Sequence, residues 1–295
     1  MVIKTRCGFV AIVGRANVGK STLFNALLDE QLSIATHKPQ TTRHNIRGIL
    51  SLESTQLILV DTPGIQLGNK RLINKVLISN ALSSLQEVDV ILMVIEMGRW
   101  GDEDDYLLKQ IKQANCPVVL AINKIDRIKD KPALFPILED AKSRYEFEDI
   151  VPISALHDKS MGVLTKVLSR QVPESVFLFP EDVTWDRDDA FVISEIVRGA
   201  AITQLHKELP YAIYTEVESL VFDEDLVTID VIIWVEKDSQ KPIVIGKKGA
   251  KLKAIGEQAR NRLERVFGKK VMLKTWVKVK QNWQDIQDIV SQFEQ

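Results

Sequence analysis

The sequence predicts an α/β domain with a doubly wound, mostly parallel sheet, followed by a small α+β domain. In the first half of the chain, short β-branched runs alternate with helix-length segments, which is typical of a parallel sheet with crossover helices. This alternation ends at Pro173, and a different order of elements follows. With 295 residues, the chain is long enough for two domains of ~100–200 residues each.

The first domain is predicted to span residues 1–172. Its candidate strands are Phe9–Val13, Leu57–Val60, Val90–Ile95, Val118–Ile122 and Val151–Ile153. Each run is apolar on both faces, as expected for strands that helices cover on both sides. The candidate helices between them are Ser21–Leu28, Leu72–Leu85, Asp104–Ala114 and Lys131–Arg144.

Residues 173–190 are predicted to form a linker, because they contain two prolines and an acidic cluster without clear periodicity. The second domain then spans residues 191–295. Its expected helix, strand, strand, helix and strand lie at about Ser194–Glu208, Ala212–Leu220, Leu226–Val235, Ala250–Phe267 and Val271–Val279. The short apolar segment Pro242–Ile245 fits either a strand or a helix.

Composition narrows the classes of protein. No apolar run approaches the ~20 residues needed to span a bilayer. The apolar stretch Phe9–Val13 near the N-terminus is too short for a signal peptide. Cys7 and Cys116 lie far apart in the sequence and suggest no disulfide or metal framework. We therefore expect a reduced, cytoplasmic compartment.

The charge is distributed unevenly along the chain. Residues 241–280 hold ten Lys and three Arg against two Glu, which gives this segment a net charge of +11. Because the whole chain has a net charge of −1, the remaining 255 residues carry −12. A segment this basic predicts a polyanion-binding region near the C-terminus.

The first motif is a candidate phosphate-binding loop of the form G-x-x-x-x-G-K-[ST]. It comprises Gly14, Arg15, Ala16, Asn17, Val18, Gly19, Lys20 and Ser21, with Thr22 after it. Its backbone N–H groups and the following helix N-terminus would surround phosphate oxygens. Lys20 would neutralise the β- and γ-phosphates, and the Ser21 hydroxyl would ligate Mg²⁺. Alone, this motif predicts only a nucleoside triphosphate.

The second motif follows the Leu57–Val60 strand and comprises Asp61, Thr62, Pro63 and Gly64. Asp61 would hold Mg²⁺ through a water molecule, and the Gly64 N–H would contact a γ-phosphate. A turn of this composition after a strand is also common for purely structural reasons. By itself the motif leaves both interpretations open.

The third motif predicts which base is bound. Asn123, Lys124 and Asp126 follow the Val118–Ile122 strand. Guanine presents N1–H and N2–H₂ donors side by side, and the Asp126 carboxylate can accept both, whereas adenine has an acceptor at N1 and would be repelled. A fourth segment after the next strand, formed by Ser154, Ala155 and Leu156, would support the base through backbone N–H groups.

Together the four motifs predict a GTP site. Each stands at the C-terminal end of a predicted parallel strand, where doubly wound sheets bind their ligands. Between the first two motifs, Thr41 and Thr42 lie in the polar stretch 36–47. We favour Thr42 as a Mg²⁺ ligand that is engaged only while a γ-phosphate is present, so that this stretch would be ordered by GTP and loosened after hydrolysis.

These motifs in this order resemble the translation-factor-related class of GTPases. The phosphate loop, the segment Gln40-Thr41-Thr42-Arg43 and the Asp61–Gly64 motif are similar to the TrmE-Era branch. Der-type proteins have two such domains, and TrmE has its domain inside a larger helical protein. This chain has one, over about residues 5–171, and a tail of about 105 residues, a layout that resembles the Era family.

The resemblance has implications for hydrolysis. Ras-like GTPases place a water-orienting glutamine immediately after the Asp-x-x-Gly motif, where this chain has Ile65. An apolar side chain cannot orient water, so intrinsic hydrolysis is expected to be slow, and Gln66 is offset by one residue. In relatives of this branch an asparagine equivalent to Asn17 helps to hold K⁺, which would supply positive charge beside Lys20, Thr42 and Gly64 in catalysis. A tolerated polar loop residue is an equally good interpretation of Asn17.

The tail contains a candidate RNA clamp that resembles the G-x-x-G loop of type II KH domains. The residues assigned to RNA binding are Gly246, Lys247, Lys248, Gly249, Lys251 and Lys253. The glycines allow a single-stranded backbone to approach, and the lysines meet its phosphates. Arg260 and Arg262 are also expected to face outward. Trp276, among the lysines of the last strand, fits either base stacking or packing beneath lysine stems.

The resemblance implies a Mg²⁺-dependent GTPase switch that binds GTP and GDP and acts as a monomer. Its implied partners are the 16S ribosomal RNA near its 3′ end and the 30S subunit, and its implied role is small-subunit maturation. The main alternative is a GTP-gated scaffold of the membrane or of cell division, whose basic tail contacts anionic lipid at the inner membrane. A P-loop kinase or ATPase is a further alternative, which Asp126 disfavours.

Overall fold

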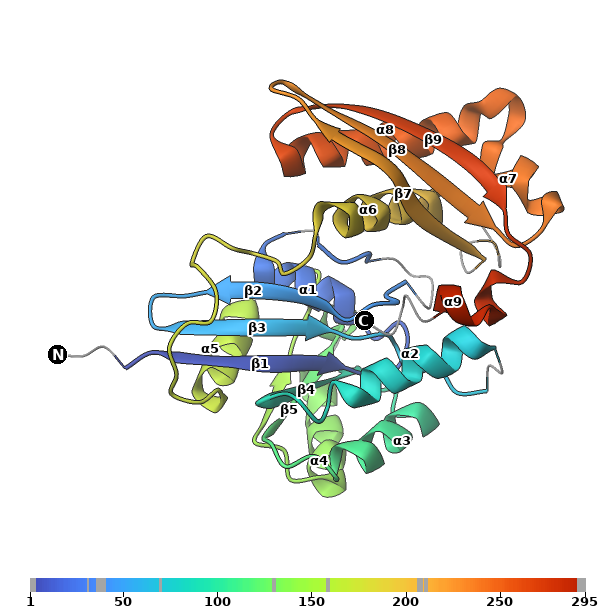
Figure 1. The fold of residues 1–295 in the computed structure, drawn as a ribbon. Helices are drawn as coiled ribbons and strands as arrows, with labels where there is room; N and C mark the ends of the chain where they lie inside the picture. The colour runs from blue at the N-terminus through green and yellow to red at the C-terminus, as the bar shows by residue number, and fades with distance from the viewer. Residues whose placement is uncertain are drawn as a thin grey trace. The chain divides into compact units, whose positions relative to one another are not determined.

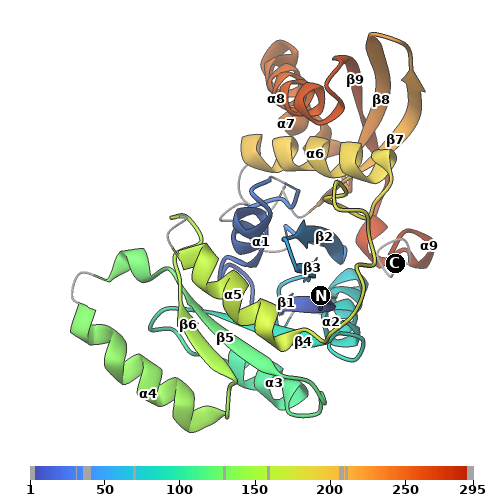
Figure 2. The same ribbon diagram turned by 90° about the vertical axis from the view of Figure 1, so that its left-hand side faces the viewer.

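A computed structural model of the chain describes residues 4–30, 32–35, 41–68, 71–128, 131–157, 160–205, 209 and 212–290. The first compact unit ends at Asp186, and the second runs from Arg187 to Gln292. Both are seen in Figure 1 and Figure 2. Gln40, with the rest of residues 36–40 of the predicted switch segment, lies outside the described residues. So do residues 206–208, where the first helix of the tail was expected to end.

The first unit is built around a six-stranded sheet. Its strands are β1 (Arg6–Val13), β2 (Ile46–Ser51), β3 (Thr55–Asp61), β4 (Val90–Glu96), β5 (Val118–Asn123) and β6 (Asp149–Pro152). Their order is β2-β3-β1-β4-β5-β6, and the pairs are parallel except for β2, which runs antiparallel to β3. This confirms the predicted doubly wound, mostly parallel sheet.

Helices cover both faces of this sheet. They are α1 (Lys20–Leu28), α2 (Leu72–Ser83), α3 (Asp102–Ile111), α4 (Leu134–Arg144) and α5 (Met161–Gln171). Side chains of α2, α3 and α4 pack with β1, β4 and β5 in one apolar core, while α1 and α5 lie on the opposite face (Figure 2). Strands buried from both sides explain why their sequences are continuous apolar runs.

Two elements of this unit were not predicted. Strand β2 lies at the edge of the sheet and contains a glycine and an arginine, so its sequence lacks the apolar run of the central strands. Gly48 is needed there, since a Cβ atom would lie 2.3 Å from Leu28 Cδ1 of α1. Strand β2 begins at Ile46, so the last two residues of the predicted polar stretch 36–47 belong to this strand. Helix α5 was also missed.

The segment after α5 is bound along the sheet of the first unit. The Oε1 atom of the buried Gln56 side chain accepts from the backbone N–H groups of Leu178, at 2.9 Å, and Phe179, at 3.0 Å. Single β-bridges join Glu174 to Arg6 of β1 and Trp185 to Gly48 of β2. The prolines and acidic residues of this segment thus form an extended path, and its polar backbone is satisfied by strand edges and one glutamine.

The second unit is a small α+β domain. Its elements are α6 (Asp189–Gln204), β7 (Ile213–Phe222), β8 (Leu226–Val235), α7 (Lys241–Ile245), α8 (Ala250–Phe267), β9 (Lys270–Val279) and α9 (Gln287–Val290). The sheet order is β7-β8-β9, with β7 antiparallel and β9 parallel to β8. Helices α6 and α8 pack together and cover one face of this sheet (Figure 2).

Two features of this unit differ from the sequence-based expectation, and the structure decides a third that the sequence left open. Helix α6 begins at Asp189 rather than near Ser194, because Asp188 caps it by accepting from the Phe191 N–H at 2.7 Å. The ambiguous segment is the short helix α7, which has a proline in its first turn. The helical segment α9 was not predicted. In the described part of the chain no helix has the length and apolarity to cross a membrane.

Candidate functional site

The predicted phosphate loop joins β1 to α1 and is held by the backbone of Ile65, the residue after the second motif. The Ala16 N–H donates to Ile65 O at 3.1 Å, and the Ile65 N–H donates to Gly14 O at 3.3 Å. Gly19 ends the loop at φ 103°, and a Cβ atom there would lie 2.3 Å from Asn123 Nδ2. Both the positive φ and the close approach require glycine at this position.

Lys20 is buried at the first turn of α1, and its ammonium group donates to the Arg15 carbonyl at 3.1 Å. Burial lowers the pKa of Lys20 to about 8, although the nearby carboxylates of Asp61 and Asp104 act in the opposite direction. A buried cation beside a glycine-containing loop is suited to an anionic ligand. Gly64 lies close by, and a Cβ atom there would be 2.8 Å from Ala16 Cα and 3.1 Å from Lys20 Nζ.

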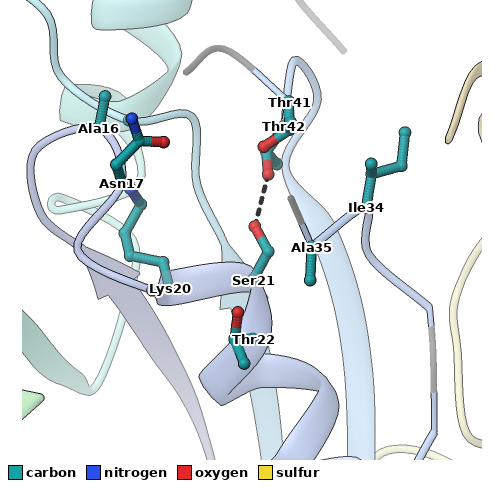
Figure 3. Close-up of a pocket in the computed structure, with 11 residues that line it drawn as sticks. Ala16, Asn17, Lys20, Ser21, Thr22, Ile34, Ala35, Thr41 and Thr42 are labelled. Carbon is teal, nitrogen blue, oxygen red and sulfur yellow. Dashed lines mark hydrogen bonds between the residues drawn. The ribbon is translucent and has the colours of Figure 1, made fainter. Parts of the chain in front are cut away.

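Lys20, Ala16 and Gly64 line a pocket that encloses about 380 Å³, part of it open to solvent. Figure 3 shows the hydroxyl groups of Ser21 and Thr42 facing each other across it, with their oxygens 2.7 Å apart. Thr41 and Thr42 both line the pocket, but the Thr42 hydroxyl is the one that reaches Ser21 and, at 3.3 Å, Asp61 Oδ2. The structure therefore brings Ser21, Thr42 and Asp61 together.

The Asp61 carboxylate is fully buried at the end of β3. Burial raises its pKa, against the effect of the Lys20 charge and of hydrogen bonds from Ser33, Ser21 and Thr42. Its Oδ1 atom has no hydrogen-bond partner among the described residues. A buried carboxylate with an unsatisfied oxygen beside two hydroxyl groups is a set of hard oxygen donors, so the residues present fit Mg²⁺.

The third motif forms the junction of three loops. The Asn123 side chain donates to Val18 O at 2.8 Å and accepts from the N–H groups of Lys124, at 2.7 Å, and Ala155, at 3.0 Å. Lys124 Nζ donates to Asn17 O at 2.7 Å. The amide group of one asparagine thus connects the phosphate loop to the segment after β6, and Lys124 ties the same loop a second time.

Asp126 is exposed beside this junction, and the Ser154 hydroxyl donates to its Oδ1 atom. That hydrogen bond lowers the pKa of Asp126, so the side chain is ionised at neutral pH. The fixed carboxylate keeps further acceptor capacity, which is the arrangement needed to bind a pair of adjacent N–H donors.

Other predicted residues take different positions. The Arg15 side chain turns away from the pocket, and its Nε donates to Asp104 Oδ2 at 3.1 Å. Val18 is buried, Thr62 donates to Ile12 O at 2.8 Å, and Leu156 is 71% exposed beside the base loop. Ala16, Asn17 and Thr22 line the pocket, whereas Pro63 is buried next to it.

Sequence reasoning missed several residues of this site. Ile34 and Ala35 line the pocket, and the Ser33 hydroxyl donates to Asp61 Oδ2 at 2.7 Å. These residues belong to no spaced motif, so no sequence pattern marks them. Glu96 was missed as well, although it ends β4 next to Asn123 in the sheet register.

In the second unit, the predicted clamp connects α7 to α8. Gly246, Lys248 and Gly249 adopt positive φ values of 76°, 53° and 79°. A Cβ atom at Gly246 would lie 2.7 Å from Lys251 Cβ, so the loop closes tightly on the start of α8. Lys247 and Lys248 are exposed, Lys251 is half-buried, and Lys253 is exposed and pairs loosely with Glu257 at 3.8 Å.

One residue of the basic surface of this unit differs from its prediction. Arg262 is half-buried rather than outward, and this burial lowers its pKa while the charge of Glu195 raises it. Trp276 is 40% exposed, and the ammonium groups of Lys278 and Lys280 lie over the neighbouring Trp234 ring, at 6.0 and 5.5 Å.

Comparison with known proteins agrees with both units. Residues 9–124 match the family model described as a 50S ribosome-binding GTPase, and residues 208–284 match the KH domain. GTPase Era of Xanthomonas axonopodis pv. citri is 47% identical over 280 residues, with 95% of this chain and 94% of that protein covered. GTPase Era of Stenotrophomonas maltophilia is 46% identical over 279 residues, with the same coverage.

Two solved structures are similar over 98% of this chain. One is Era in complex with MgGDPNP and nucleotides 1506–1542 of 16S ribosomal RNA, with a TM-score of 0.95, 37% identity and 98% of that chain covered. The other is a point variant of Aquifex aeolicus Era bound to GDP.AlF4−, with a TM-score of 0.94, 37% identity and 99% covered. With a phosphate loop, a base loop and a KH domain in this order, the chain belongs to the Era family of GTPases.

Proposed function

We propose that this chain is a Mg²⁺-dependent GTPase switch that binds the 16S ribosomal RNA of the small subunit, near its 3′ end, and acts in maturation of the 30S subunit. The observation that carries this proposal is the similarity, with a TM-score of 0.95, to Era bound to MgGDPNP and 16S nucleotides 1506–1542. The charge of +11 over residues 241–280 supports RNA as the polyanion. The comparisons give the alternative of a lipid-binding scaffold no support.

Each residue of the proposed nucleotide site has an expected role. Lys20 and the backbone of residues 14–19 would bind the β- and γ-phosphates, and the Gly64 N–H would contact the γ-phosphate. Ser21, Thr42 and Asp61, the last through water, would hold Mg²⁺, which neutralises charge on the phosphate oxygens when bound. Asp126 would accept the two guanine donors, with Asn123 and residues 154–156 fixing its surroundings.

The proposed domain boundaries are the ones predicted from the sequence. Residues 1–172 would be the GTPase domain, 173–190 the connection and 191–295 the RNA-binding domain. Thr42 is followed closely by β2, which begins at Ile46. Release of the Thr42 hydroxyl after γ-phosphate loss would therefore change the segment that leads into this edge strand.

The clamp is tested by replacing Lys247 and Lys248 together with Asp. We expect binding of an RNA with 16S nucleotides 1506–1542 to weaken at least ~100-fold, because two phosphate contacts become repulsive. The slope of log affinity against log salt should also fall by about 1.4, the value for two contacts on a single strand. Fluorescence anisotropy at several salt concentrations measures both quantities.

The matched control replaces Lys109 of α3 and Lys112, at the end of that helix, with Asp, which changes the net charge equally on an exposed surface of the other unit. This control should bind RNA like the wild type. Wild-type affinity of the Lys247/Lys248 variant would contradict the clamp. Binding of the same variants to anionic vesicles tests the predicted contact with the inner membrane. Gel filtration of the purified protein tests whether this protein, expected in the cytoplasm, is a monomer.

Potassium is the second proposed cation. Ile65 is 1% exposed and hydrogen-bonded to the phosphate loop through its backbone, so its side chain cannot orient water. Asn17 lines the phosphate pocket (Figure 3) at φ 65°. We expect GTP turnover to be ~10-fold faster in KCl than in NaCl, since K⁺ held by Asn17 would add positive charge beside the phosphates.

The control for potassium is Asn17→Gly, because glycine accepts the positive φ but lacks the amide oxygen. Its turnover should be slow and equal in the two salts. If the wild type hydrolyses GTP at the same rate in KCl and NaCl, this role of Asn17 is wrong.

A further inference from the structure

Glu96 is a buried carboxylate that the predicted motifs do not use. It is the last residue of β4 and lies next to Asn123 in the parallel register. Its side chain is 7% exposed. Burial of a carboxylate is costly unless cations compensate it, so its surroundings indicate why it is there.

Four cationic side chains surround this carboxylate. Its Oε1 atom is 2.7 Å from Arg127 Nη1 and 3.2 Å from Lys124 Nζ. Its Oε2 atom is 3.6 Å from Arg15 Nη2 and 3.7 Å from Arg99 Nη1. The two oxygens are therefore divided between different parts of the site: one faces the base loop, and the other faces the phosphate loop and the turn after β4.

One of these cations binds the phosphate loop directly, and a second belongs to it. Lys124 Nζ donates to Asn17 O at 2.7 Å, and Arg15 belongs to that loop itself. Arg15 is further held by Asp104 at 3.1 Å and by the Arg99 carbonyl at 3.2 Å. Without Glu96, the cations from three loops would repel one another at the point where these loops meet.

We propose that Glu96 is a positioning residue that fixes the base loop against the phosphate loop and thereby sets guanine affinity and selectivity. It acts through Lys124, Arg127 and Arg15 and does not touch the nucleotide. The inference rests on the proposed recognition of guanine by Asp126. Glu96, a carboxylate outside the motifs, would determine how accurately Asp126 is aligned with the base.

The test is Glu96→Gln, which keeps the shape of the side chain and removes its charge. We expect GDP to dissociate ~10–100-fold faster, because a loosened site changes dissociation more than association. The preference for GTP over ITP should fall about tenfold, since inosine lacks the N2 amino group and the ratio reports how well Asp126 is aligned. Stopped-flow release of a fluorescent GDP analogue and competition with ITP measure the two quantities.

Two further variants keep the test decisive. Glu139→Gln, an exposed carboxylate of α4 paired with Lys142, is the matched control and should behave like the wild type. Glu96→Asp keeps the charge on a shorter side chain and should give an intermediate dissociation rate. If Glu96→Gln does not fold, a Glu96→Asp variant with wild-type dissociation and selectivity would overturn the proposal.

A double-mutant cycle separates positioning from general stabilisation. If Glu96 acts through Lys124, adding Lys124→Met to Glu96→Gln should speed GDP release by less than ~3-fold over the faster single variant. Multiplicative effects, or faster release with an unchanged GTP to ITP ratio, would overturn the proposal. A wild-type protein with no preference for GTP over ITP would instead contradict the role of Asp126.

Discussion

Replacing Asp126 with Asn is expected to weaken GDP binding by ~10²–10³-fold, because a site built to accept two N–H donors loses its charged acceptor. The structure supports a large effect, since the Ser154 hydroxyl holds the carboxylate in place and its pKa is lowered. The preference for guanine over adenine nucleotides should weaken with it. Isothermal titration with GDP and ADP measures both changes.

The same variant should gain affinity for xanthine nucleotides. Xanthine has a carbonyl acceptor at C2 in place of the guanine amino group, and an asparagine amide can donate to it while still accepting from N1–H. The control is Asp140→Asn, which removes an exposed carboxylate that pairs with Arg144 on α4. Unchanged GDP affinity in Asp126→Asn would show that another group selects the base.

Lys20→Met is the second substitution with a large expected effect. Lys20 Nζ is the buried cation of the phosphate pocket, 3.1 Å from the Arg15 carbonyl, and methionine fills similar space without charge. Loss of a fixed positive group at the phosphates should reduce GTP turnover by about 10²–10³-fold. Lys109→Met on the exposed surface of α3 is the control and should hydrolyse GTP normally.

The lowered pKa of Lys20 predicts a second difference between this variant and the wild type, in the pH dependence of GDP affinity. Burial lowers that pKa to about 8 from its ordinary value of 10.5, so the nucleotide-free protein loses this proton as the pH rises through about 8. Phosphate binding requires the ammonium form, so binding takes up a proton above that pH. GDP affinity of the wild type should fall by up to about tenfold per pH unit above pH 8, and below about pH 7 the titration of Lys20 should have no effect on it. This pH dependence should be missing in Lys20→Met.

Many of the residues that the structure brings together in the candidate nucleotide site could be predicted, because they follow strong local signals in the sequence. Central strands buried on both faces have unmistakable apolar runs, and parallel strands place the residues after each run at one edge of the sheet. This is why Lys20, Asp61 and Asn123 converge as expected, although they are far apart in sequence. In the tail, the helix Ala250–Phe267 has the bounds predicted from its apolar spacing.

What the sequence did not predict depends on long-range contacts. Strand β2 is an edge strand whose place is set by pairing with β3, and Ser33 reaches Asp61 without any motif. Arg262 is a surface residue by helical periodicity, yet it is half-buried and lies within reach of the charge of Glu195 on another helix. The surroundings of Glu96 could not be predicted for the same reason. Its four cationic partners, residues 15, 99, 124 and 127, come close to it only after the sheet has formed.

The most direct test of the central claim is the binding of guanine and adenine nucleotides to the purified, nucleotide-free protein. If residues 14–21 bind the phosphates and Asp126 selects the base, GDP should bind at least ~10³-fold more tightly than ADP in the presence of Mg²⁺. Titration calorimetry under identical conditions gives the ratio of the two dissociation constants. Equal affinity for GDP and ADP would contradict the assigned nucleotide site and the switch built on it.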